Sequence, residues 1–252
     1  MGMSGRTGDG PSVVALWSAP RSRSTAFLRM IAERGDHVVL HEPFSQLTDF
    51  GVYDVAGQTV RCEAELIARI ERLAADGPVF FKDTTDFRYP GLLADRGFLR
   101  RVSHIFLIRD PAAAIASHFA LNPRLTSPEV GFERLAEIHD AVTTAGGAAV
   151  VVDSDDLVTD PPATVAAVCA AVGWDFRPNT LSWSPGLLPQ WQRTSRWHVR
   201  TGATDGFRPV PAEYPDTVAN HSVLAAFDAH HRPFYQRLRD RRIAIERNSS
   251  VR

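Results

Sequence analysis

The sequence lacks the features that mark several large classes of protein. Its two cysteines, Cys62 and Cys169, each fall in a helix-like segment, which favours buried thiols over a disulfide or a metal pair. No apolar run approaches the ~20 residues that a membrane-spanning helix needs. The net charge is -1, so no overall basic field attracts nucleic acid or anionic lipid. We therefore expect a cytoplasmic protein with no membrane or nucleic-acid partner, and a homo- or hetero-oligomer is compatible with the sequence.

Lysine is nearly absent as well. The chain has one lysine, Lys82, and every other member of its 28 basic Lys and Arg residues is an arginine. A lysine retained in such a composition is a candidate for a site that needs a compact ammonium rather than a planar guanidinium. Chance survival is the alternative explanation.

The strongest local signal lies in residues 13–28. Residues 13–17 are apolar and typical of a buried parallel strand, and from residue 24 apolar side chains recur at helical spacing. The N-terminus of such a helix presents free N–H groups and the positive end of the helix dipole to an anion. The turn before it supplies further charge and donors through Arg21, Ser22, Arg23, Ser24 and Thr25. This stretch predicts a phosphate or sulfate site, with an ordinary strand-to-helix turn as an equal alternative.

The remaining chain alternates short apolar runs with helical patterns. This alternation predicts an α/β fold with three layers, in which a central, mainly parallel sheet is flanked by helices. Ligands of such folds bind beyond the carboxyl ends of the strands. Polar residues follow five predicted strands, namely Arg21 and Ser22, His41 and Glu42, Lys82 with Asp83 and Thr84, Arg109, and residues 153–156. Their repeated occurrence there favours the anion site over the plain turn.

The pattern also predicts the domain organisation. Residues 1–11 are rich in Gly and Ser and are expected to form a flexible arm, and residues 246–252 a flexible tail. Residues 12–245 are expected to form a single domain. Within it, residues 45–59 show no clear period and are predicted to be a long loop. Residues 177–211 are rich in proline and tryptophan and are predicted to be a lid or binding loop.

Several of these motifs together resemble the sulfotransferases that use 3′-phosphoadenosine 5′-phosphosulfate (PAPS), the bacterial members above all. Residues 20–25, Pro-Arg-Ser-Arg-Ser-Thr, are similar to the family's P-[RK]-S-G-[ST]-[ST] loop. Residues 109–117 are similar to its R-[ND]-x6-S motif, with the spacing kept. Residues 154–161 resemble its Y-E-D-L-x-x-D-P turn, and residues 41–44, His-Glu-Pro-Phe, its E-P segment. The resemblance runs from about residue 13 to residue 173 and implies a P-loop-like sulfotransferase fold.

The resemblance implies roles for individual residues. The loop residues Arg21 to Thr25 would hold the 5′-phosphosulfate of PAPS, and Arg109 with Ser117 its 3′-phosphate. Lys82 would stabilise the transferring group, and Glu42 is the first choice for the base, with His41 and Asp83 as alternatives. Arg196, Trp197 and Arg200 are predicted to contact the nucleotide from a lid at residues 192–201. No metal is expected.

The reaction implied is transfer of a sulfuryl group from PAPS to a hydroxyl or amine of a small-molecule acceptor. A variant is sulfation that creates a leaving group for a later step. The alternative hypothesis is a non-catalytic subunit or scaffold, and two departures from the family pattern support it. Arg23 replaces a usual glycine, and Thr84 stands where many members have a catalytic histidine. A P-loop kinase or other nucleotide transferase is the third hypothesis, although the loop lacks the G-x-x-x-x-G-K-[ST] spacing.

Overall fold

The computed structural model describes residues 10–209 and 212–245. The predicted tail, and residues 1–9 of the predicted arm, lie outside the described residues. The side chain of Arg200 also lies outside them.

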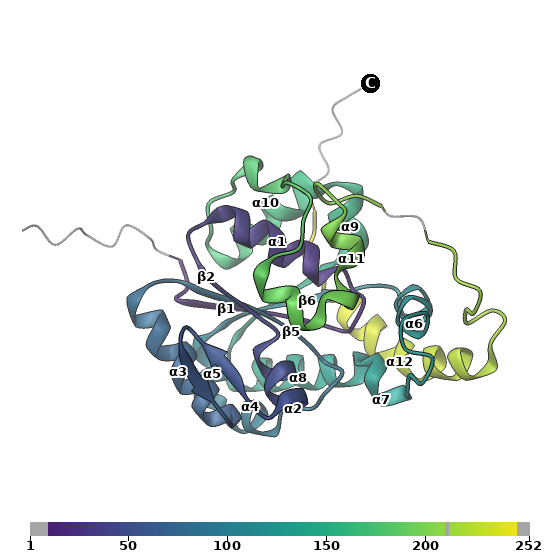
Figure 1. The fold of residues 1–252 in the computed structure, drawn as a ribbon, viewed down its shortest axis with the longest axis horizontal. Helices are drawn as coiled ribbons and strands as arrows, with labels where there is room; N and C mark the ends of the chain where they lie inside the picture. The colour runs from purple at the N-terminus through teal and green to yellow at the C-terminus, as the bar shows by residue number, and fades with distance from the viewer. Residues whose placement is uncertain (1–9, 210–211, 246–252) are drawn as a thin grey trace, which may run out of the picture.

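A five-stranded parallel sheet forms the centre of the fold, as the sequence predicts (Figure 1). Its strand order is β2-β5-β1-β6-β7, so β1 lies in the middle and the chain crosses over it between β5 and β6. The strands are β1 (Val13–Ser18), β2 (Val38–His41), β5 (Val79–Thr84), β6 (Ser103–Ile108) and β7 (Ala148–Asp153). Because the strands are parallel, all their carboxyl ends lie along the same edge of the sheet. The strand order reverses at β1, and ligands of such folds bind beside this reversal.

Helices cover both faces of the sheet. One face carries α1 (Ser24–Arg34) and α10 (Pro161–Val172), and the other carries α3 (Glu63–Asp76), α8 (Phe132–Ala145) and α12 (Ser222–Arg239) (Figure 1). Shorter helices connect these elements: α4 (Pro90–Ala94), α5 (Arg96–Arg101), α6 (Pro111–Phe119), α7 (Ser127–Val130) and α9 (Ser154–Thr159).

The continuous apolar character of β1 follows from this burial on both faces. Val13, Ala15 and Trp17 pack into one apolar core, whereas Val14 and Leu16 pack into the other. All six residues of β1 are buried. The polar turn after β1 therefore starts from a fixed position, because the strand that leads into it is held by neighbours on every side.

The segment at residues 45–59, predicted to be a long loop, is mostly ordered secondary structure. It contains most of α2 (Pro43–Phe50) and the strands β3 (Tyr53–Val55) and β4 (Gln58–Val60) of a small antiparallel hairpin. The helix begins at Pro43, and the buried carboxylate of Asp83 accepts hydrogen bonds from the Phe44 and Ser45 amides, at 2.6 and 3.1 Å. Pro43 suits the first turn of this helix, but the side chain that caps it comes from a strand 38 residues away.

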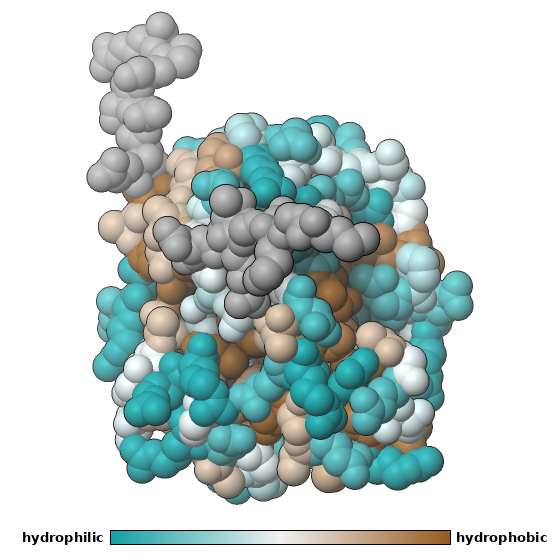
Figure 2. Space-filling view, turned by 90° about the vertical axis from the view of Figure 1, so that its left-hand side faces the viewer, coloured by the Kyte–Doolittle hydropathy of each residue, from teal (hydrophilic) through white to brown (hydrophobic). Residues whose placement is uncertain are grey.

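The described part of the predicted loop, residues 177–209, contains short helical turns: η1 (Pro178–Leu181), η2 (Pro189–Trp197) and α11 (Val199–Gly202). Helix α12 continues through Pro233. On the face seen in Figure 2, hydrophilic residues are interspersed with apolar ones. Among the described residues, no helix combines the length and the apolar character that crossing a bilayer would require.

The core of the sheet also contains a histidine whose two ring nitrogens are both engaged. His104 Nδ1 accepts a hydrogen bond from Trp17 Nε1 at 2.9 Å, and His104 Nε2 donates to the Leu99 carbonyl at 3.0 Å. This pairing requires the neutral imidazole, because the charged ring has no acceptor nitrogen. Burial lowers the pKa of His104 from 6.5 to about 4.

We predict that this histidine makes the fold sensitive to acid. Between pH 6.5 and 4 the unfolded chain binds a proton at His104 that the folded chain excludes, so stability is lost as the pH falls. From pH 7 to pH 5 this one group lowers the free energy of unfolding by about 2 kcal/mol. Urea unfolding at both pH values should show a smaller loss in His104→Gln than in the wild type. An equal loss in both proteins would contradict the prediction.

Candidate active site

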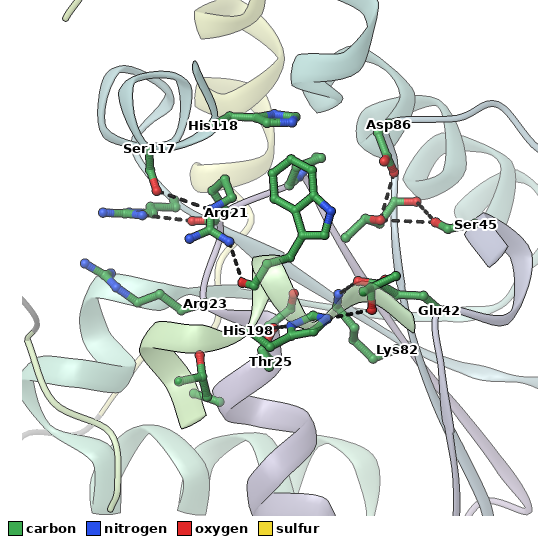
Figure 3. Close-up of a pocket in the computed structure, with 18 of the residues that line it drawn as sticks. Arg21, Arg23, Thr25, Glu42, Ser45, Lys82, Asp86, Ser117, His118 and His198 are labelled. Carbon is green, nitrogen blue, oxygen red and sulfur yellow. Dashed lines mark hydrogen bonds and ion pairs between the residues drawn. The ribbon is translucent and has the colours of Figure 1, made fainter. Parts of the chain in front are cut away.

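An open pocket lies at the carboxyl ends of the strands and gathers the polar residues that follow them. Its cavity volume is about 200 Å³. Arg21 comes from the turn after β1, Glu42 from the end of β2, Lys82 from β5 and Arg109 from the end of β6. Figure 3 shows the two chemical ends of the pocket: Arg21, Arg23 and Ser117 lie on one side, and Glu42, Asp86 and Ser45 on the other.

The turn between β1 and α1 has an unusual backbone. Arg21 and Arg23 adopt the left-handed conformation, with φ of 66° and 65°, and Glu42 after β2 does so with φ of 50°. In the described chain only one other non-glycine residue, Ala56, has a positive φ. Three of these four residues therefore line the pocket, where strain of about 1 kcal/mol or more per residue is commonly stored at functional sites.

The backbone explains why a glycine suits position 23 in the motif that this loop resembles. A residue with φ of 65° costs a side-chain-bearing amino acid free energy that glycine does not lose. The Arg23 guanidinium forms an ion pair with Asp155 and donates to Ser154 Oγ at 3.2 Å. Its side chain therefore reaches across the rim of the pocket to α9 without filling the turn.

The other loop residues divide between the pocket and the core. Ser24 and Thr25 line the pocket at the start of α1. Ser22, predicted to contact the nucleotide, is fully buried and is not part of the lining, and its hydroxyl has no hydrogen-bond partner in the described structure. Only the main chain of Ser22 is placed to contribute to an anion site.

Arg109 and Ser117, the second predicted anion contact, lie next to this loop. Arg109 Nη1 donates to the main-chain carbonyl of Arg21 at 2.8 Å, and Arg21 Nε donates to Ser117 Oγ at 3.2 Å. Within the described residues Arg109 forms no ion pair, and its buried Nε has no hydrogen-bond partner. Burial, and then the positive charge of Arg23, lower the pKa of Arg109 to about 10.

The predicted catalytic residues Lys82 and Glu42 form a buried ion pair. The Lys82 side chain is 2% exposed and that of Glu42 13%. Burial alone would raise the pKa of Glu42, but the positive charge of Lys82 outweighs burial and lowers the pKa to about 2. Glu42 is therefore held ionised as long as Lys82 faces it.

The histidines beside this pair are neutral. His41 Nε2 lies 3.1 Å from His198 Nε2, and Thr25 Oγ1 lies 3.2 Å from His198 Nδ1. Burial, and then the neighbouring His41, lower the pKa of His198 to about 3, and burial lowers that of His41 to about 4. His198 lines the pocket, whereas His41, named from the sequence as an alternative base, lies behind it with 1% exposure.

A metal ion was not expected from the sequence, but one cluster has suitable atoms. Ligand atoms of His41, Glu42 and His198 all lie within 4.8 Å of one another. The Lys82 ammonium already contacts Glu42, so a cation bound there would lie next to a positive charge.

Asp83 does not reach the pocket, in contrast to its prediction as an alternative base. It is fully buried, and its carboxylate is occupied by the Phe44 and Ser45 amides and the Ser45 hydroxyl. Asp86, a carboxylate just beyond the same strand, does line the pocket, and sequence reasoning missed it. Asp86 follows β5 by two residues, in the same strand-end position as the other polar residues, and that position was the available signal.

The residues of the predicted lid differ in whether they line the pocket. Trp197 lines the pocket, and its main-chain carbonyl accepts a hydrogen bond from Arg21 Nη1 at 2.8 Å. Arg196 is exposed and lies outside the lining, with its guanidinium 4.7 Å from the Trp197 ring. The Arg200 side chain, also predicted to contact the nucleotide, lies outside the described residues. Trp191 is fully buried in the core.

The parallel sheet, the cationic turn at the N-terminus of α1 and the pocket at the strand ends define a P-loop-like α/β protein. The family model described as the sulfotransferase domain matches residues 12–242. The chain therefore belongs to the sulfotransferase family, which confirms the resemblance noted in its sequence.

Individual relatives extend the comparison. Branched-chain-amino-acid aminotransferase-like proteins 2 and 1 of Arabidopsis thaliana are each 28% identical to this chain, over 215 and 218 residues. These matches cover 81% and 82% of this chain but 38% of each plant protein, so the chain spans well under half the length of these relatives.

Similar solved structures include the sulfotransferase domain from the curacin biosynthetic pathway. It has 14% identity and a TM-score of 0.46, with 87% of this chain and 97% of that one covered. A sulfotransferase from Alicyclobacillus acidocaldarius has 17% identity and a TM-score of 0.45, with coverage of 76% and 92%.

The backbone at position 23 gives a direct test of the loop conformation. Arg23→Gly and Arg23→Ala both lose the ion pair with Asp155, but only glycine relieves the left-handed strain. We expect Arg23→Gly to be more stable than Arg23→Ala by about 1 kcal/mol, measured by urea unfolding. An alanine variant as stable as the glycine variant would show that residue 23 is not held in this conformation.

Proposed function

We propose that this chain transfers a sulfuryl group from PAPS to a hydroxyl or amine of a small-molecule acceptor. The support comes from the family, from the two neighbouring anion contacts, and from the pocket that continues beyond them to a lysine and a carboxylate. In this proposal the main-chain amides at the start of α1, with Arg21, Ser24 and Thr25, hold the 5′-phosphosulfate. Arg109 and Ser117 hold the 3′-phosphate.

The observation that carries the proposal is the state of Arg109. A half-buried guanidinium with a buried, unused Nε, no ion pair in the described structure and two arginines nearby is unfavourable unless an anion binds it. Its hydrogen bond to the Arg21 carbonyl joins this contact to the turn at α1. Two linked anion contacts fit a nucleotide with phosphates at both ends of its ribose better than a triphosphate chain.

The transfer step assigns complementary roles to Lys82 and Glu42. The acceptor oxygen forms a bond to sulfur while the bond from sulfur to the bridging phosphate oxygen breaks, and 3′-phosphoadenosine 5′-phosphate (PAP) leaves. Lys82 stabilises the negative charge that develops on the bridging oxygen. As the ammonium turns toward the donor, Glu42 loses the charge that keeps its pKa low, and it can then take the acceptor proton.

In the same proposal residues 177–211 act as a lid over the nucleotide. The hydrogen bond from Arg21 to the Trp197 carbonyl connects this segment to the phosphate loop, and His198 and Thr201 also line the pocket. The segment would thus close on the same arginine that holds the donor.

The first prediction of this proposal concerns nucleotide affinity. Arg109→Ala should weaken PAP binding about 30- to 100-fold, which corresponds to the loss of a charge-assisted contact of about 2 to 3 kcal/mol. Isothermal titration calorimetry measures the effect, with Arg101→Ala on the surface as the matched control. ATP with Mg²⁺ should bind the wild type at least about tenfold more weakly than PAP.

The outcomes separate the three hypotheses that the sequence leaves open. PAP binding that survives in Arg109→Ala would contradict the assigned 3′-phosphate site. Tight binding of ATP and Mg²⁺ with no PAP binding would support a kinase or nucleotide transferase. Binding of neither nucleotide would support a non-catalytic subunit.

The second prediction separates chemistry from binding. Glu42→Gln should slow acceptor-dependent release of PAP from PAPS at least about 100-fold, because the glutamine amide cannot take the acceptor proton. PAP affinity should change by less than about threefold, since Glu42 contacts the acceptor side of the pocket.

Glu71→Gln on the surface is the control, and chromatography of the released PAP is the measurement. An active Glu42→Gln variant would show that another group is the base. A loss of PAP affinity as large as that in Arg109→Ala would show that Glu42 acts in donor binding.

A further inference from the structure

The acceptor end of the pocket carries acidic groups that sulfuryl transfer does not require. Asp86 and Asp49 both line the pocket, and Asp86 lies on the side of Glu42, opposite Arg21 and Arg23. Asp86 is half-buried and Asp49 is exposed. Among the described residues neither carboxyl forms an ion pair, whereas Glu42 is neutralised by Lys82. Figure 3 shows Asp86 at this end, across the pocket from Arg21 and Arg23.

Hydrogen bonds of the Asp86 side chain hold it in place without neutralising it. Asp86 Oδ1 accepts a hydrogen bond from Thr84 Oγ1 at 2.8 Å, and Thr84 Oγ1 in turn lies 3.1 Å from Ser45 Oγ. Arg134 donates to the main-chain carbonyl of Asp86 and not to its carboxyl group. Burial, and then the charge of Glu42, raise the pKa of Asp86 to about 6. A positive charge beside Asp86 would therefore be favourable, because it would pair with the carboxylate and offset the repulsion from Glu42.

The walls of the pocket are aromatic as well as acidic. Phe50, Phe87 and Trp197 line the same space, and the Arg193 guanidinium already lies 3.9 Å from the Phe50 ring. Aromatic faces attract cations as well as apolar groups. An anionic acceptor would meet Asp86 and Asp49 at this end, and at the other end it would compete with the donor for the arginines.

We infer that the acceptor carries a positively charged amine in addition to the group that is sulfated, and that the Asp86 carboxylate binds this ammonium. This inference deepens the proposed function and rests on it, since it assigns a substrate class to the acceptor end of the same pocket. Asp49 adds a weaker attraction at the mouth, where water screens its charge. The class of acceptor is thus an amino alcohol or aminophenol with an aromatic or apolar body.

Three probes of matched shape test the inference. Tyramine carries an ammonium at the end of its side chain, para-propylphenol a methyl group there, and para-hydroxyphenylpropanoate a carboxylate. Each is titrated by calorimetry into the chain alone and into the chain saturated with PAP. Tyramine should bind about tenfold more tightly than para-propylphenol, and the propanoate should bind most weakly.

Variants assign the preference to a residue. In Asp86→Asn the affinities for tyramine and para-propylphenol should become equal within about twofold, with PAP affinity unchanged. Asp76→Asn removes an exposed acid outside the pocket and should keep the tenfold preference. If Asp86 acted only as a proton acceptor, its replacement would leave these binding affinities unchanged, which would overturn the inference.

Other outcomes are equally decisive. A neutral or anionic probe that binds as tightly as tyramine would overturn the inference, as would no tyramine binding at millimolar concentration to either form. Failure of the proposed function is seen separately, because in that case the wild-type chain does not bind PAP. The charge preference at Asp86 can still be measured then, on the chain alone.

Discussion

A half-buried arginine that forms no ion pair among the described residues is the constraint on which the interpretation of this site depends. Arg109 is fixed by the end of β6, by the start of α6 and by its hydrogen bond to the Arg21 carbonyl. Its pKa is lowered by burial and by Arg23, so the charged guanidinium is electrostatically unfavourable where it lies. A carboxylate beside Arg109 would offset this cost. In the proposed function, the 3′-phosphate of the nucleotide supplies the negative charge instead.

The opposite end of the pocket has the complementary arrangement. Lys82 and Glu42 neutralise each other, which lowers the free-energy cost of keeping an ammonium at 2% exposure. Asp86, two residues beyond β5, has no such partner in the described chain. The pocket is therefore polarised, with positive groups where the donor would lie and negative groups where the acceptor would lie. Such polarity orients two substrates before any chemistry occurs.

The sequence predicted the parallel α/β fold because apolar strands and their polar ends are local features. The same positions identified Arg21, Glu42, Lys82 and Arg109, which the structure gathers in one pocket. Long-range contacts were not predictable. Asp83 was a plausible base until the structure showed it capping α2, which itself was missed because its cap comes from β5.

The direction in which a side chain points could not be predicted from the sequence either. Ser22 and His41 follow strands as their neighbours do, but they face the core, and Arg196 faces solvent. Asp86 went unrecognised because only its position within the fold separates it from an ordinary surface acid. At Arg23 the departure from the motif costs free energy in the left-handed backbone, and the side chain fits because it pairs with Asp155 outside the turn.

The measurement that tests the central claim most directly is a crystal structure of the chain with PAP. The account predicts the 3′-phosphate on Arg109 and Ser117, and the 5′-phosphate on the amides at the N-terminus of α1 beside Arg21. The Lys82 ammonium should face the 5′-phosphate. A nucleotide bound with its 3′-phosphate away from Arg109, or outside the strand-end pocket, would contradict the account.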